Sequence, residues 1–163
     1  MVSPKPTKEL SGGQKLSLKS MYFNRYLVFR YLTAVFFFTN LYWLIISIGT
    51  GGYTWIIAAS LLFGAGLVTI EQVKKYWKPD NTLTITHIYY LVQIVVNLLL
   101  IVSVALGQRT WFFPFLTDQS NGWLMGFLAI GIVISALLEY RIYLIEHNRD
   151  RYLQRIKQFS ASL

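Results

Sequence analysis

The sequence predicts an all-α, polytopic membrane protein with four transmembrane helices. Three observations support this fold class: an apolar composition, four long apolar runs, and basic residues gathered on one side of those runs. Of the 163 residues, 55% are hydrophobic and only 13% are charged, against about 25% charged residues in soluble domains. This leaves too little polar surface to cover a water-facing globule, so a bilayer is the expected solvent.

The four apolar runs cover residues 31–48, 54–70, 88–106 and 123–138. The first three approach the ~20 residues that cross a ~30 Å hydrocarbon core as a helix. The fourth reaches that length only when residues 139–145 are added. Backbone groups in lipid must bond within their own segment, so each run is expected to be helical. No cleavable signal peptide is expected, because roughly thirty polar and basic residues precede the first run.

Basic residues predict the orientation of the chain. Fourteen of the 15 Lys and Arg residues precede the first run, separate the second from the third, or follow the fourth. Arg109 alone falls on the other side. By the positive-inside rule, both termini are expected in the cytoplasm. The predicted organisation is a basic N-terminal segment (1–25), a transmembrane bundle (26–145), and an amphipathic cytoplasmic extension of the last helix (146–163).

Aromatic residues cluster near the predicted span ends, where amphipathic rings favour the membrane interface. The set expected toward the outer interface comprises Tyr42, Trp43, Tyr53, Trp55, Trp111 and Trp123. The loop between the third and fourth runs is largely aromatic around Pro114, and we expect it to lie in the outer headgroup layer.

Polar side chains occur at bilayer depth in the first and third runs. Asn40 lies near the middle of the first, on one helical face with Thr33, and Asn97 lies near the middle of the third, on one face with Tyr90 and Gln93. Both faces are expected to point into the bundle, with Asn40 and Asn97 approaching each other. This polar seam has two interpretations: interhelical hydrogen bonding, or the lining of a solute path.

Two carboxylates end the second and fourth runs at the predicted inner interface. Glu71 and Glu139 are interpreted either as proton carriers or as groups in local salt bridges. The local partners would be Lys74 or Lys75 for the first carboxylate and Arg141 for the second. The order of Glu71 and Lys75 is the stabilising i,i+4 order on a helix.

Basic residues next to the spans are expected to face anionic lipid headgroups, which attract each charge by about 1 kcal/mol near the surface. The residues assigned to this role are Lys15, Lys19, Arg25, Lys74 and Lys75. Because the basic residues lie beside spans rather than on a soluble face, no nucleic-acid partner is expected.

Several reaction and cofactor classes lack their residues. The chain has no cysteine, and His87 and His147 are distant in sequence without clustered carboxylates, so no metal is expected. Neither histidine has an evident acidic partner, and no G-x-S-x-G elbow is present, which argues against serine hydrolysis. We therefore expect no cofactor and no catalytic residue.

The five letters LSGGQ at residues 10–14 match the signature motif of ATP-binding-cassette ATPases. That motif requires a large soluble domain with a G-x-x-x-x-G-K-[ST] phosphate loop, which this chain lacks. Gly12 and Gly13 are instead interpreted as a flexible joint before a basic membrane-surface stretch.

The final segment carries an apolar stripe with four- and three-residue spacing. Its members are Leu138, Ile142, Ile145, Tyr152, Ile156 and Phe159, interrupted at Arg149. The pattern predicts one continuous helix from Trp123 to about Phe159 that projects into the cytoplasm. The stripe is expected to dock on the N-terminal segment, lie on anionic lipid, pair with its own copy, or bind another protein.

Residues 20–45, SMYFNRYLVFRYLTAVFFFTNLYWLI, resemble small four-span membrane proteins of Gram-positive bacteria. Some of those proteins carry labels that link them to cellobiose-type phosphotransferase-system IIA components. The likeness covers about the first fifty residues and includes no catalytic motif. A IIA component of that class is a soluble helical protein phosphorylated on histidine, a plan from which this chain departs, so the resemblance implies no site residue.

These observations favour a non-enzymatic accessory or regulatory protein of the bacterial plasma membrane, which associates with a membrane complex or with itself. The alternative is a small oligomeric transporter or channel subunit that uses Asn40, Gln93 and Asn97 as a solute path. A water-accessible cavity that reaches Asn97 would favour transport. A dry seam beside an exposed cytoplasmic stripe would favour the accessory role.

Overall fold

The computed structural model describes residues 11–51, 53–77 and 82–161, and every regular element in these ranges is helical. Four helices are long and apolar enough to cross a membrane. They are α2 (Leu27–Gly49), α3 (Trp55–Trp77), α4 (Thr84–Ala105) and α6 (Asn121–Glu146). The predicted fold class of four long apolar helices is thus confirmed, and the chain is a candidate multi-pass membrane protein.

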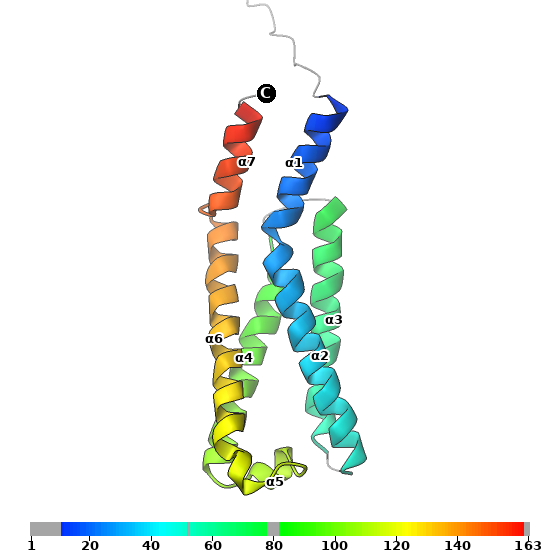
Figure 1. Cartoon of the computed structure of the whole chain (residues 1–163), viewed down its shortest axis with the longest axis vertical. Coiled ribbons are helices and arrows are strands. Elements are labelled where there is room, and N and C mark those ends of the chain that lie inside the picture. Colours follow the sequence, from blue (N-terminus) through cyan, green and yellow to red (C-terminus); the bar gives the residue numbers. More distant parts are fainter. Residues whose placement is uncertain (1–10, 52, 78–81, 162–163) are drawn as a thin grey trace, which may run out of the picture.

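The four long helices form two antiparallel hairpins. α2 packs along α3, and α4 packs along α6, while the hairpins meet mainly between α3 and α4 (Figure 1). The backbones of α2 and α6 approach each other at few points at most. Short elements complete the chain at the two ends of the bundle: α1 (Gly12–Arg25) and α7 (Arg151–Ala161) at one end, and α5 (Arg109–Phe112) and η1 (Asp118–Ser120) at the other.

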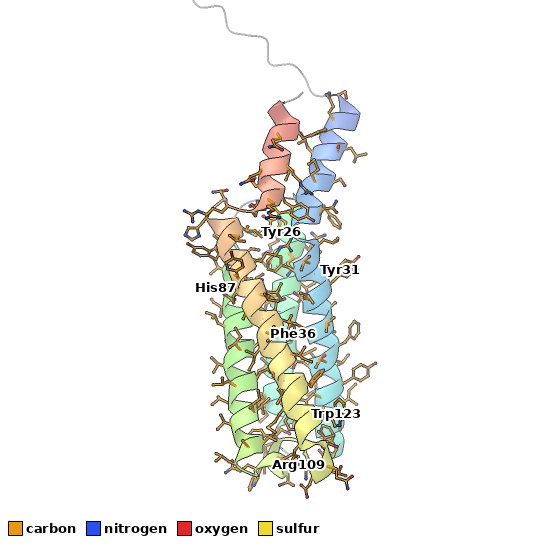
Figure 2. The ribbon with its side chains drawn as sticks, turned by 60° about the vertical axis from the view of Figure 1, so that its left-hand side comes forward. Tyr26, Tyr31, Phe36, His87, Arg109 and Trp123 are labelled. Atoms are coloured by element: carbon orange, nitrogen blue, oxygen red, sulfur yellow. The ribbon has the colours of Figure 1, made fainter. Side chains whose placement is uncertain are left out.

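Side chains mark these two ends. Tyr26 and His87 lie toward the end that carries α1 and α7, and Arg109 and Trp123 lie toward the end that carries α5 (Figure 2). Phe36 lies between the two levels. We call these two ends of the bundle the α1/α7 end and the α5 end.

Helix α1 begins at the Gly-Gly pair that the sequence suggested as a joint. Ser11 is the N-cap: its hydroxyl accepts from the Gln14 backbone N–H (3.4 Å), and the Gln14 side chain accepts from the Ser11 backbone N–H (2.8 Å). This reciprocal capping box satisfies two N–H groups at the helix start. The expectation of a flexible joint is wrong, because Gly12 and Gly13 form the first turn of α1.

The predicted continuous helix from Trp123 to Phe159 is also wrong. α6 ends at Glu146 and α7 begins at Arg151. Between them Asn148 has φ 54°, a left-handed conformation that asparagine tolerates better than most residues and that ends helices. A side-chain oxygen of Asp150 then accepts from the Leu153 backbone N–H (3.3 Å), which caps the start of α7.

Two apolar clusters fill the interior. The cluster nearer the α1/α7 end contains Tyr26, Phe29, Leu138, Ile142 and Ile145 among its buried members. The cluster nearer the α5 end contains Leu100, Val104, Phe113, Leu124 and Leu128. Large apolar side chains are also exposed along the outside of all four long helices, including Val35, Phe38, Phe63, Val95, Leu99, Phe127, Val133 and Leu137. Such a surface suits hydrocarbon and not water.

Candidate functional site

The interior of the bundle holds a row of amide side chains on α4. Gln93 and Asn97 are both buried, and Gln93 Nε2 donates to Asn97 Oδ1 at 3.1 Å. The Tyr89 hydroxyl donates to Gln93 Oε1 at 3.3 Å. These bonds satisfy polar atoms within one helix face, as lipid-embedded side chains require.

A second set of polar side chains joins three helices. Thr33 Oγ1 of α2 lies 2.8 Å from the Tyr90 hydroxyl of α4, and Gln72 Nε2 of α3 donates to the same Thr33 oxygen at 3.2 Å. All three residues are buried. Thr33 and Tyr90 were assigned to the seam from the sequence, but Gln72 was not. Its position one residue after Glu71, at the polar end of an apolar run, is the sequence signal that was missed.

Asn40 lies on α2, beside the Tyr89 hydroxyl of α4. It is only 3% exposed, and its Nδ2 has no hydrogen-bond partner. Asn40 shares a cavity of about 260 Å³ with Gln93 and Asn97. Both asparagines are buried and line one cavity, while a direct approach of their side chains stays a prediction.

Close helix packing places Asn97 in that cavity. On the α6 side, Gly131 lies so close that a Cβ at this position would fall 2.5 Å from Asn97 Nδ2. A glycine is therefore what allows the α4 amide to lie against the α6 backbone, as small residues do between membrane helices.

Trp43 also lines the cavity, and its expected place toward the outer interface stays a prediction. Its ring stacks on Phe113, with the centroids 5.3 Å apart. The indole Nε1 is buried and has no hydrogen-bond partner. Phe113 belongs to the aromatic loop that was expected in the headgroup layer. It is buried instead, so that part of the loop closes the α5 end of the bundle.

Glu71 caps a neighbouring helix, in place of the local salt bridge considered from the sequence. Its two oxygens accept from the backbone N–H groups of Ile85 (3.2 Å) and Thr86 (2.8 Å), and one also accepts from the Thr86 hydroxyl (2.6 Å). A carboxylate is favourable at a helix N-terminus, where N–H groups lack intrahelical partners. Because the cap comes from α3 while α4 supplies no side-chain cap of its own, no local sequence signal predicts it.

Glu139 pairs with a histidine that is remote in sequence. Its Oε2 contacts His87 Nδ1, while its Oε1 is buried without a partner. The expectation that neither histidine has an acidic partner is therefore wrong for His87. No local pattern predicts this pair, because it joins α4 to α6. Arg141, the expected local partner, lies instead over the rings of Phe29 and Tyr152.

A buried ion pair joins the last residue of α1 to the segment before α7. Arg25 Nε and Nη2 each donate to a different oxygen of Asp150 at 2.8 Å, and Arg25 is 1% exposed. Such a bidentate arrangement gives strong, directional bonds. We call this Arg25–Asp150 pair the clasp. The expectation that Arg25 faces lipid headgroups is wrong, because its side chain is buried between α1 and the α6–α7 connection.

The other basic residues assigned to lipid contact differ from one another. Lys74 is exposed. Lys75 is buried and donates to the Thr82 hydroxyl at 3.2 Å, so a lipid-facing role is wrong for it. The side chains of Lys15 and Lys19 lie outside the described part of the structure.

The C-terminal stripe docks within the chain. α7 packs against α1 (Figure 1). Ile142, Ile145 and Ile156 are buried, Phe159 is half-buried and Tyr152 is exposed. Leu153 is buried although the stripe omitted it. The reason is the break before α7, which changes the helical phase. Residues 153 and 156, and not residue 152, therefore face α1.

No group of three or more His, Cys, Asp or Glu converges on a metal-sized position within residues 11–51, 53–77 and 82–161. Comparison of the chain with protein-family models, with curated proteins and with solved structures found no match. The resemblance of residues 20–45 to small four-span proteins gains no support from these searches. The site therefore has to be interpreted from its own geometry.

Proposed function

We propose that this chain is a non-enzymatic accessory or regulatory protein of the bacterial plasma membrane, which acts by associating with a membrane complex or with itself. The observation that carries the proposal is the two-helix unit of α1 and α7, held beyond the four long helices by the clasp (Figure 1). Buried ion pairs contribute little net stability, but they can fix one arrangement among several. The apolar stripe, whose exposure would have favoured this role, is largely buried. The surface that the unit offers for association is therefore the outer side of α7, where Arg151, Gln154 and Arg155 are exposed.

The polar seam supports an architectural role over a solute path. Thr33, Tyr90 and Gln72 bond across three helices, and Tyr89, Gln93 and Asn97 bond along one. The cavity beside them is lined by apolar and neutral polar side chains, with no charged residue among them. Proton- and cation-coupled transport generally uses an ionisable group at membrane depth.

Charge supports an orientation with both termini in the cytoplasm. Exposed basic side chains gather at the α1/α7 end, namely Lys74, Arg149, Arg151 and Arg155. At the α5 end, Arg109 is buried and paired with Asp118 at 2.6 Å. Basic residues favour the cytoplasmic side of a membrane, and anionic lipid there attracts them.

The test is the size of the purified particle at native expression. In mild detergent, light scattering should give a protein mass well above the 18.9 kDa of one chain, with a fixed stoichiometry. Asp150→Asn removes the clasp charge and should lower the assembled fraction. Asp118→Asn neutralises the ion pair at the α5 end and is the matched control, expected to leave assembly unchanged. A particle that contains one chain and nothing else would contradict the proposal.

The alternative, a small oligomeric transporter or channel subunit, is favoured by one observation: the cavity reaches Asn40, Gln93 and Asn97. Proteoliposomes in isosmotic solutions of small neutral solutes distinguish the two functions by their swelling rate. If the chain has the accessory role, proteoliposomes that contain it should swell at the same rate as protein-free vesicles. Faster swelling that is lost in Asn97→Leu would establish the alternative in its place.

A further inference from the structure

The cavity between the hairpins has an opening on the lateral surface of the bundle. Val35 and Ile46 of α2 and Phe127 and Ile130 of α6 line it, and each is between 41% and 59% exposed. Exposed residues from these two helices place the mouth between α2 and α6, whose backbones approach each other at few points at most. These four side chains are apolar and belong to helices that can cross a membrane. The mouth therefore faces hydrocarbon.

The cavity lies at membrane depth. Phe36, which lines it, is found between the levels of Tyr26 and Arg109 (Figure 2). Phe113 and Leu116 of the aromatic loop close it toward the α5 end. Its volume of about 260 Å³ is just below the range of about 300–1,000 Å³ for small-molecule sites. It can hold a compact group, with the remainder of a longer molecule outside the mouth.

Two hydrogen-bond donors in this cavity form no hydrogen bond. Asn40 Nδ2 and Trp43 Nε1 are buried and come from adjacent turns of one face of α2. The Tyr89 hydroxyl lies beside Asn40 but donates to Gln93, and its oxygen does not form a hydrogen bond with Asn40 Nδ2. Gln93 donates to Asn97, so the α4 amides do not use the two donors either. An unpaired donor in an apolar environment destabilises the folded protein. A molecule with an acceptor at this position would remove that cost.

We propose that this cavity binds the carbonyl group of a neutral, lipid-soluble molecule that enters from the bilayer between α2 and α6. A carbonyl oxygen has two lone pairs and can accept from both donors. A charged group is excluded by the lining, which offers it no counter-charge. The rings of Trp43, Phe113 and Phe127 favour a planar carbonyl compound. Free carbonyl compounds and the ester groups of membrane lipids share this chemistry. The inference holds whether or not the chain associates with a partner.

The experiment uses the full chain in nanodiscs of diether lipid, which has no ester carbonyl. The probes are 2-methyl-1,4-naphthoquinone and 2-methylnaphthalene, which share a ring system and differ in the two carbonyl groups. The chain has no cysteine that the quinone could alkylate. Binding is measured by the ligand-dependent rise in unfolding temperature and by calorimetric titration. A second set of nanodiscs, made of diester lipid, tests whether lipid esters occupy the same site.

We expect the quinone to bind about tenfold more tightly than the hydrocarbon, as one or two buried hydrogen bonds imply. Asn40→Leu should remove this difference while leaving hydrocarbon binding intact. Trp43→Phe, which keeps a ring and deletes the N–H group, should reduce the difference. Ser60→Ala is the control, because that hydroxyl is exposed and bonds to its own helix.

If lipid esters are the occupant, diester lipid should raise the unfolding temperature of the native chain above its value in diether lipid, and Asn40→Leu should abolish the rise. Diester lipid would then also weaken quinone binding. The inference is overturned if neither the quinone nor the ester lipid produces an effect that depends on Asn40. Equal binding of both ring compounds would likewise reduce the site to a nonspecific apolar cavity.

Discussion

Individual polar side chains within the bundle are fixed by partners on other helices. The Thr33 hydroxyl shows this most clearly, since it lies 2.8 Å from the Tyr90 hydroxyl and accepts from Gln72 at 3.2 Å. Deleting the Thr33 hydroxyl removes both of these bonds and leaves the Tyr90 hydroxyl and Gln72 Nε2 without this partner in an apolar environment. Interhelical bonds of this kind contribute about 0.6 kcal/mol on average in membrane proteins, and up to about 1.7 kcal/mol.

A double-mutant cycle on Thr33→Val and Tyr90→Phe should therefore yield a coupling energy of about 0.5–1.5 kcal/mol. The readout is the free energy of unfolding in mixed micelles. The control cycle pairs Tyr90→Phe with Ser60→Ala, whose hydroxyl bonds to the Ile56 carbonyl of its own helix. Those two changes should be additive. A coupling below about 0.3 kcal/mol for the first pair would show that the contact does not hold α2 to α4.

Whole elements differ in how well the sequence predicts them. The spans were predictable because length and apolarity are set by the bilayer: the run 88–106 corresponds to α4, Thr84–Ala105. The start of α1 was also predictable in principle, since Ser11 and Gln14 form a capping box with the recognised S-x-x-Q spacing. The break at Asn148 was not, because an asparagine adopts positive φ only when its surroundings favour it.

Helix packing depends on glycines in a way that sequence spacing alone does not reveal. Gly64 and Gly66 both lie in α3, but only the first is close to another helix. A Cβ at Gly64 would fall 2.9 Å from Tyr89 Cδ2, while at Gly66 nothing lies within 4 Å. The Tyr89 ring cannot easily retreat, since it is buried, packs edge-on against Tyr90 and bonds to Gln93.

Gly64→Ala should accordingly destabilise the protein by about 1–3 kcal/mol through overpacking. Gly66→Ala should be neutral, or stabilising by up to about 1 kcal/mol, because alanine is the better helix former. Thermal unfolding of both variants in one detergent measures the difference, which isolates the contact from helix propensity. Equal effects of the two substitutions would mean that α3 and α4 are not in close contact at Gly64.

At the scale of the whole molecule, two hairpins share one main contact between α3 and α4. The clasp links the two hairpins at the α1/α7 end, and the cavity lies on the side between α2 and α6. This explains why the sequence predicted the seam residues but not their surroundings. Periodicity identified a face containing Asn97, whereas the partners of Glu71, Glu139 and Arg25 lie 14 to 125 residues away, and only the tertiary fold brings them together.

The orientation of the molecule yields the final prediction. Because the native chain has no cysteine, each introduced cysteine is its only thiol. Ser17 of α1 and Ser160 of α7 are exposed at the α1/α7 end, and Gln119 of η1 is exposed at the α5 end. If basic residues mark the cytoplasmic side, a membrane-impermeant maleimide should label Gln119→Cys in intact cells. Ser17→Cys and Ser160→Cys should react only after the membrane is permeabilised. The reverse pattern would invert the orientation, and different labelling of positions 17 and 160 would contradict an even number of membrane crossings between them.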